Sequence, residues 1–111
     1  MTDATLILRK WTGVIRTADE ADYVAYIDAT GTADYVATPG NRGFQMLLRD
    51  LGDGRSEVTT LSWWESLDAI RGFAGEDIAI ARYYPQDDRF LLERPQQVEH
   101  HRVMSRSLSV G

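Results

Sequence analysis

An Asp-Gly step between two strand-like runs constrains the fold of this chain more than any other feature of its sequence. The runs cover residues 43–51 and 57–64, and Gly52-Asp53-Gly54-Arg55 joins them. Asp-Gly favours a tight turn whose twist matches that of two antiparallel strands. The sequence therefore predicts a central β-hairpin, with these two runs as antiparallel neighbours.

A strand and a helix are expected before the hairpin. Residues 5–16 carry apolar side chains on both faces, with Leu6, Leu8 and Val14 on one face and Ile7, Trp11 and Ile15 on the other. This pattern predicts a strand that is buried on both sides. Thr17 and Glu20 match the capping box, in which each side chain satisfies a backbone donor at a helix start. A helix is therefore predicted to begin at Thr17.

Apolar positions at helical spacing indicate that this first helix packs on a sheet. Its stripe consists of Tyr23, Val24, Ile27 and Gly31. The turn formers of residues 39–43 end whatever structure runs through Tyr35, so we expect a long connection over 32–43.

A second helix and a last strand are expected after the hairpin. Ser66 is a suitable N-cap for a helix through Leu67, Ile70 and Phe73, which Gly72 or Gly75 can end. The remaining predictions are a short helical continuation over 76–84, a turn at 85–89, an apolar anchor at 90–92, a final strand over 97–104 and a polar tail over 105–111.

The resulting order is β-α-β-β-α-β, which is typical of a ferredoxin-like α+β domain with two helices on one face of an antiparallel sheet. The other face of the sheet needs a cover, and too few residues are left to provide one. A second copy of the chain is the economical solution, so we expect a homodimer.

Composition excludes several classes of function. The net charge is −5 and no basic stripe is present, which argues against a nucleic-acid partner. The chain has no Cys, so disulfides and thiolate metal sites are excluded, in keeping with a reducing compartment. No run approaches the roughly 18 to 20 apolar residues that span a bilayer. We therefore expect a cytoplasmic protein with no membrane partner.

His100 and His101 are the side chains whose ordinary pKa lies nearest neutrality, and on a strand they point to opposite faces. Either can be a structural residue, and only one can face a given pocket. We favour His100, which follows Val98 by two residues. As a general base it would take the proton of a phenol, and a phenolate gives an electron to O₂ more readily than its neutral parent. No helical His spacing suggests a metal site.

Aromatic residues supply the other candidates. Trp63 and Trp64 fall on opposite sides of their strand, so one packs in the core or at a dimer interface and the other can line a cavity. Five tyrosines are many for a domain of this size, and buried phenols need hydrogen-bond partners. Arg82 is suited to hold an anionic oxygen, although an ion pair with Asp87 or Asp88 is the more ordinary explanation.

Two common motifs are absent. The Pro-Gly-Asn-Arg-Gly stretch at 39–43 leads into a strand and lacks the Lys-Ser/Thr end of a phosphate-binding loop. No Gly-x-Ser-x-Gly elbow supports a serine hydrolase.

Several segments resemble those of a known family. They are Tyr23 with Tyr26, Thr38-Pro39-Gly40-Asn41-Arg42-Gly43, Leu61-Ser62-Trp63-Trp64-Glu65-Ser66, Phe73-Ala74-Gly75-Glu76-Asp77, Ala81-Arg82-Tyr83-Tyr84-Pro85 and Val98-Glu99-His100. Together they resemble the antibiotic biosynthesis monooxygenase-like family of dimeric α+β barrels. The resemblance runs from about Leu6 to Val103 and implies one such domain over 1–104, followed by the tail. It also favours His100 and Trp64 as the members of their pairs that face a pocket.

The resemblance leaves the chemistry open, because a fold does not fix a function. The haem-degrading branch uses an Asn on the first strand and a His after the second helix, where this chain has Arg9-Lys10-Trp11 and Arg82-Tyr83-Tyr84. That branch is therefore disfavoured. The polyketide-oxidising branch has an amide shortly before the Trp, and Thr60 stands at about that place here.

The leading hypothesis is a cofactor-independent monooxygenase that oxidises a small aromatic or quinol-like metabolite with O₂ and uses no metal. The predicted catalytic residues are His100, Trp64 and Arg82, and the predicted substrate-binding residues are Tyr26, Asn41, Thr60, Tyr83 and Tyr84. The alternatives are a non-catalytic dimer that binds a hydrophobic metabolite, and a polyketide cyclase or isomerase that needs no oxygen.

Overall fold

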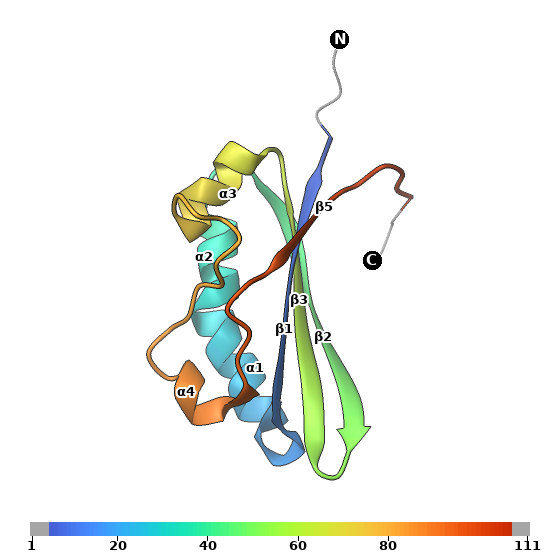
Figure 1. The fold of residues 1–111 in the computed structure, drawn as a ribbon, viewed down its shortest axis with the longest axis vertical. Helices are drawn as coiled ribbons and strands as arrows, with labels where there is room; N and C mark the ends of the chain where they lie inside the picture. Colours follow the sequence, from blue (N-terminus) through green and yellow to red (C-terminus); the bar gives the residue numbers. More distant parts are fainter. Residues whose placement is uncertain (1–4, 108–111) are drawn as a thin grey trace.

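The protein consists of one antiparallel sheet with helices packed on one of its faces (Figure 1). The computed structural model describes residues 5–107. Its elements are β1 (Ile7–Arg16), the 3-10 turn η1 (Thr17–Asp19), α1 (Glu20–Ala29), α2 (Gly31–Ala37), β2 (Asn41–Gly52), β3 (Arg55–Trp64), α3 (Leu67–Ala74), α4 (Asp87–Phe90), β4 (Leu91–Glu93) and β5 (Glu99–Arg102). The predicted α+β, ferredoxin-like order is confirmed.

The sheet is built around β1, which pairs with β3 along its whole length. β2 follows β3, while β4 and β5 pair with the two ends of the other edge of β1. The predicted hairpin of β2 and β3 is confirmed. Asp53 and Gly54 both have positive φ angles, 54° and 74°, as the tight turn favoured by Asp-Gly requires.

The predicted capping box at the start of the first helix is wrong. The Thr17 hydroxyl lies 2.9 Å from the hydroxyl of Ser56 on β3, and the Ser56 hydroxyl donates to the Glu20 carboxylate. Neither η1 nor α1 has a side-chain N-cap bond. Because Ser56 is fully buried, its hydroxyl needs partners, and this tertiary contact replaces the local one.

The expected long connection over 32–43 is also wrong, because residues 31–37 form α2. The helical stretch breaks at Thr30, where φ is −122° and ψ is −84°, and then resumes. Thr32 and Tyr35 are buried on the sheet, so tertiary packing extends the helix beyond the stripe that the sequence shows.

The helix predicted after Ser66 is confirmed as α3, but the helical continuation predicted over 76–84 is wrong. Ser66 caps α3 by accepting the backbone N–H of Ala69 at 3.0 Å, and Gly75 ends it at a φ of 91°. Beyond Gly75 the chain is irregular rather than helical, because its backbone bonds to the segment before β5. The Ala81 N–H donates to the Gln96 carbonyl, and the Val98 N–H donates to the Ala79 carbonyl.

The C-terminal part differs from the prediction in detail. The expected turn at 85–89 contains the single helical turn α4, and the apolar anchor at 90–92 contributes to β4. The last strand covers Glu99–Arg102 rather than 97–104. Residues 103–107, which cover the end of the predicted strand and the start of the predicted tail, have no regular structure. Residues 108–111 of the tail lie outside the described residues.

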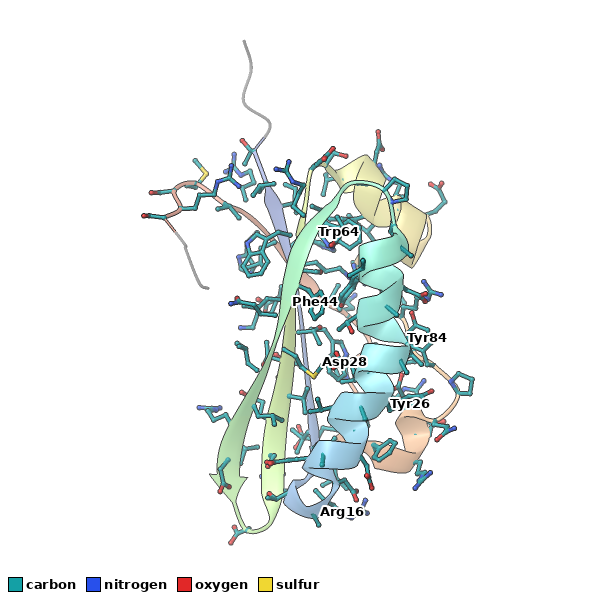
Figure 2. All side chains as sticks on the ribbon, turned by 180° about the vertical axis from the view of Figure 1, so that it is seen from behind. Arg16, Tyr26, Asp28, Phe44, Trp64 and Tyr84 are labelled. Atoms are coloured by element: carbon teal, nitrogen blue, oxygen red, sulfur yellow. The ribbon has the colours of Figure 1, made fainter. Side chains whose placement is uncertain are left out.

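Two hydrophobic clusters fill the space between sheet and helices. One contains Ile15, Tyr23, Ile27, Val58 and Phe90, and the other contains Tyr35, Trp64, Ile70 and Phe73. Figure 2 shows Trp64 and Phe44 beside α2, with Tyr26 at the far end of the helical layer near α4. No helix among residues 5–107 is long and apolar enough to cross a bilayer.

The bond from Ser56 to the start of the helical layer predicts a stability effect. We expect Ser56→Ala to lower the free energy of unfolding by about 1–2 kcal/mol, because a buried bond to a carboxylate is lost. In a double-mutant cycle followed by urea unfolding, Ser56→Ala should couple to Glu20→Ala. Asp22, an exposed acid two residues further along the helix, provides the control and should show no coupling to Ser56. Equal coupling to both acids would contradict this assignment.

Candidate active site

A cavity of about 50 Å³ lies between the two core clusters. It sits under the break between α1 and α2, and side chains of β1, β3 and the 79–87 segment close it. The residues that line it are Arg9, Trp11, Tyr23, Ile27, Thr30, Gly31, Tyr35, Thr60, Phe73, Arg82, Tyr83, Tyr84, Asp87 and Val98. Most of these side chains are apolar or aromatic, and a few polar groups converge among them, as in ligand sites generally.

Hydrogen bonds between its walls hold the cavity in shape. The Trp11 indole Nε1 donates to the Tyr83 hydroxyl at 3.2 Å, and that hydroxyl donates to the Pro95 carbonyl. The Tyr35 hydroxyl lies 3.3 Å from the hydroxyl of Thr60. A strand, a helix and the irregular segment are thereby joined around one space.

Arg82 and Tyr84 share an acidic partner on α2. An Arg82 Nη2 lies 3.2 Å from an Asp34 carboxylate oxygen, and the Tyr84 hydroxyl donates to the same oxygen at 2.5 Å. The Arg82 guanidinium also covers the Phe73 ring at 4.9 Å and the Tyr84 ring at 5.0 Å. Burial, together with the bond to Asp34, raises the pKa of Tyr84 above its ordinary value. Tyr84 is therefore a neutral donor at pH 7.

The other end of the cavity is formed around Asp87. One carboxylate oxygen accepts the Tyr23 hydroxyl at 3.0 Å, and the other accepts the backbone N–H of Tyr84 at 2.6 Å. Burial and then the charge of Asp87 raise the pKa of Tyr23 well above its ordinary value. Both oxygens of this buried acid are therefore already engaged by the protein.

Arg9 contributes a buried cation from β1. Only 2% of the surface of this residue is exposed to solvent. Its Nη1 donates to the Ile78 carbonyl at 2.5 Å and to His100 Nε2 at 2.9 Å, and its Nη2 donates to the Ile80 carbonyl at 3.3 Å. Burial lowers the pKa of Arg9 from its ordinary value, but an arginine at neutral pH stays protonated.

His100 on β5 stands directly opposite Arg9 on β1 and lies behind it, outside the cavity lining. Because a guanidinium only donates, His100 Nε2 is the acceptor and its proton resides on Nδ1. Burial, and then the positive charge of Arg9 and the neighbouring His101, lower the pKa of His100 below 6.5. His100 is therefore neutral at pH 7, with its basic lone pair held by Arg9.

Comparison with known proteins locates this arrangement in a known fold. No protein-family model matches the sequence, and no curated protein sequence matches it. Solved structures do match. A candidate antibiotic biosynthesis monooxygenase from Bacillus cereus aligns over 95% of this chain and 99% of its own, with a TM-score of 0.59 and 15% identity.

Two further structures have named activities. A cofactor-independent oxygenase from Streptomyces nogalater aligns over 96% of this chain and 97% of its own, with a TM-score of 0.50 and 17% identity. A haem-degrading protein from Mycobacterium tuberculosis aligns over 95% of this chain and 99% of its own, with a TM-score of 0.54 and 20% identity. The chain has the antibiotic biosynthesis monooxygenase fold. At these identities the match describes the fold alone.

Within this fold, the cavity brings together part of the predicted site. Thr60, Arg82, Tyr83 and Tyr84 line it. Trp64 does not, because it is fully buried in the core and its indole Nε1 donates to the Ser62 hydroxyl at 2.9 Å. Trp64 instead supports the wall from behind, in edge contact with Tyr35 at 5.9 Å between ring centroids.

Two further predicted substrate-binding residues lie elsewhere. The Tyr26 hydroxyl accepts the backbone N–H of Gln86, outside the cavity lining. Asn41 begins β2, where its side-chain oxygen accepts the Gly43 N–H at 3.0 Å and stabilises the bulge there. Arg82, expected to pair with Asp87 or Asp88, pairs with Asp34 instead.

Sequence reasoning did not select Arg9, Trp11, Tyr35 or Phe73 as site residues, although all four line the cavity. A signal for Arg9 was present, because it alternates with Ile7 and Trp11 on one face of the first strand. A charged residue on an otherwise apolar strand face is informative, since charged residues are seldom fully buried.

Gly13 controls the position of Trp11. A Cβ at Gly13 would lie 2.6 Å from the Trp11 ring and 3.0 Å from the Leu91 side chain. We expect Gly13→Ala to displace the indole, weaken its bond to Tyr83 and destabilise the protein by about 1–3 kcal/mol. The shift of the Trp11 indole N–H resonance and thermal unfolding measure both effects. Gly31→Ala is the control, because its Cβ would make an ordinary 3.8 Å contact. Equal effects of the two substitutions would contradict this prediction.

Proposed function

We propose that the protein is a cofactor-independent monooxygenase that oxidises a small aromatic or quinol-like metabolite with O₂. The observation that carries this proposal is an aromatic-lined cavity into which guanidinium and phenol donors converge from three parts of the chain. Such donors stabilise the oxyanion that forms when a phenol loses its proton. The named activity of the Streptomyces nogalater oxygenase, on the same fold, supports the choice of chemistry.

Two overall reactions balance without an added reductant. A hydroquinone takes one atom of O₂ into a ring C–H bond and is oxidised to the hydroxyquinone, and the other oxygen atom is released as water. Alternatively, a CH₂ group activated by a phenol ring becomes C=O, with one atom of O₂ retained in the product and the other released as water. In both reactions the deprotonated substrate is the electron donor, so the protein has to bind it, assist its deprotonation and admit O₂.

The residues divide into those at the cavity and those behind it. We assign substrate contact to Thr60, Tyr83 and Tyr84, with Arg82 at a developing oxyanion. His100 is the proposed base, and Trp64 supports the aromatic wall from the core. Tyr26 and Asn41 keep supporting roles, because each bonds to the backbone outside the cavity.

Haem chemistry does not fit the residues at this site. Arg82-Tyr83-Tyr84 offers no imidazole as an axial ligand, and the hydroxyls of Tyr83 and Tyr84 already donate to the Pro95 carbonyl and to Asp34. We therefore propose no step that involves haem.

One observation favours a second candidate, a dimer that binds a small molecule without turning it over. The lone pair of His100 Nε2 accepts an N–H of Arg9, so it is not free to take a substrate proton in this arrangement. Catalysis requires the Arg9 N–H to form its hydrogen bond with another acceptor, so that His100 Nε2 becomes free. Binding alone does not require this. A cyclase or isomerase would require the same release of His100.

We also propose that the protein is a homodimer whose copies meet at the open face of the sheet. The helices all cover the opposite face, and the segment after β5 extends away from them (Figure 1). That segment and strands β2 and β3 border a groove of about 720 Å³, lined in part by Gln45, Trp63 and Val103. Leu61 of β3 and Leu47 of β2 lie on the same face of the sheet as Trp63.

Oxygen uptake with a panel of hydroquinones and phenols tests the enzyme proposal. We expect uptake by the wild type, and a loss of about 10²–10⁴-fold in His100→Gln, because general bases contribute rates of this order. Gln keeps an acceptor for Arg9. Since the pKa of His100 is lowered, its basic form persists below pH 6.5, so the wild-type rate should rise with pH below that value and level off above it.

His101→Gln is the matched control for this measurement. His101 points to the other face of the sheet, where it bonds to Glu99, and its loss should leave uptake unchanged. Equal turnover in His100→Gln and the wild type would remove His100 from the mechanism. Saturable binding without any uptake would favour the non-catalytic dimer or the oxygen-independent cyclase.

The mass of the protein in solution tests the dimer. We expect twice the chain mass of 12.5 kDa by light scattering, and at least tenfold weaker association in Leu61→Glu, because desolvating the carboxylate at the interface costs more than its pairing with Lys10, the neighbour on β1, returns. Leu92→Glu on β4 introduces the same charge at a position that is 40% exposed and should leave the dimer intact. A monomeric wild type would disprove the assembly.

A further inference from the structure

Arg9 differs from the other arginines near the core and on the surface. The arginines within 4.0 Å of a carboxylate oxygen are Arg16, Arg42, Arg49, Arg55, Arg71, Arg82 and Arg94. All of these have side chains that are at least 40% exposed. Arg9 is 2% exposed and has no such partner within residues 5–107. Arg89, Arg102 and Arg106 also lack such a partner, but they are exposed to solvent. Among the described residues, Arg9 is thus the buried arginine without a counter-charge.

The hydrogen bonds of Arg9 go to neutral groups, the carbonyls of Ile78 and Ile80 and the ring of His100. A guanidinium has five N–H groups, so two of them have no acceptor among the described residues. Removing a charge from water is unfavourable, and neutral acceptors offset this cost less well than an anion does. Arg9 therefore retains both the charge and the donors to bind an anion.

The cavity places that charge where a ligand can reach it. Arg9 lines the cavity together with the rings of Trp11, Tyr35 and Phe73. Its guanidinium lies 5.7 Å from the centroid of the Phe73 ring. An aromatic wall and a fixed cation together favour a ligand that joins an apolar ring to an anionic oxygen.

The other charged groups of the cavity are less available to an anion than Arg9 is. Arg82 is neutralised by Asp34 at 3.2 Å. Asp87 is the acid among the lining residues, and its two oxygens are engaged by the Tyr23 hydroxyl and the Tyr84 N–H. The tyrosine phenols stay protonated because burial raises the pKa values of Tyr23, Tyr83 and Tyr84.

We propose that the cavity is an oxyanion-binding site, in which Arg9 binds the carboxylate or phenolate oxygen of a small aromatic acid. This inference rests on the proposed function in that it narrows the substrate class of the same cavity to aromatic compounds that bind through an anionic oxygen. The anionic oxygen of the ligand would also accept the Arg9 N–H that now donates to His100 Nε2. Ligand binding would thereby free the lone pair of His100.

The size of the cavity fits an anionic group better than a whole ring. A volume of about 50 Å³ is a third of the roughly 150 Å³ of an engineered cavity that binds benzene. The charged end of the ligand therefore occupies the cavity, with its ring toward the entrance.

Binding of matched anionic and neutral probes to the full chain tests the proposal. Benzoate and benzamide have nearly the same shape and differ in charge, and formate and formamide provide a smaller pair. In chloride-free buffer at pH 7, we expect each anion to shift the Trp11 indole N–H resonance and raise the melting temperature. Each neutral probe should bind at least tenfold more weakly, since one lost charge-assisted bond amounts to at least this factor.

Arg9→Met should remove the preference for the anion, and Arg9→Lys, which keeps the charge, should retain it. Arg42→Met is the control, since it removes an arginine that is half exposed and paired with Glu65 far from the cavity, and should bind benzoate as the wild type does. If Arg9→Met fails to fold, the preference for benzoate over benzamide in the wild type and in Arg9→Lys still tests the oxyanion site.

Equal binding of benzoate and benzamide to the wild type, or no binding of any probe, would overturn the oxyanion site. Undiminished benzoate binding in Arg9→Met would do the same. Because these measurements record binding without turnover, they fail independently of the oxygenase proposal, which the uptake of O₂ by neutral hydroquinones tests on its own.

Discussion

The Arg9 guanidinium is the contact on which the arrangement around the cavity depends. It joins β1 to β5 through His100 and to the irregular segment after α3 through the carbonyls of Ile78 and Ile80. That segment has little regular backbone pairing of its own, with one isolated bridge between Ile80 and Gln97. Without the side chain of Arg9, the wall that carries Arg82, Tyr83 and Tyr84 would keep the bond between Trp11 and Tyr83 but lose these three hydrogen bonds to the central strand.

The cavity exists because the core is divided. The break at Thr30 ends α1 over one hydrophobic cluster and starts α2 over the other, and the space between the clusters is bordered by Thr30 and Gly31. A single continuous helix would carry one apolar stripe across the sheet and close this gap. The interruption that weakens the helical pattern in the sequence is thus the same feature that leaves room for a ligand.

What the sequence predicts well depends on how local the deciding interaction is. The Asp53-Gly54 hairpin, the Ser66 cap and the end of α3 at Gly75 follow from residues within a few positions of one another, and all three are confirmed. The capping box at Thr17 matches its pattern equally well and is wrong, because Ser56, 36 residues from Glu20, provides a buried partner. The 76–84 segment fails for the same reason, since residues near β5 determine its backbone bonds.

The site follows the same rule with one instructive exception. Thr60, Arg82, Tyr83 and Tyr84 were selected through family resemblance and residue chemistry, and they line the cavity. Arg9 was not selected, although strand alternation places it on the face of Ile7 and Trp11. Its environment depends on carbonyls 69 and 71 residues away, which no local pattern reveals.

Charge is distributed unevenly along the cavity, and this distribution determines what the site can stabilise. Arg82 is partly exposed and paired with Asp34, so solvent and a carboxylate both reduce its field. Arg9 lies in the interior with neutral partners, where the effective dielectric constant is lower and the field of a charge is stronger. Since the surrounding phenols are held in their neutral form, they can donate to an anion but cannot neutralise Arg9. A negative charge that develops on a ligand is therefore stabilised most strongly at the Arg9 end.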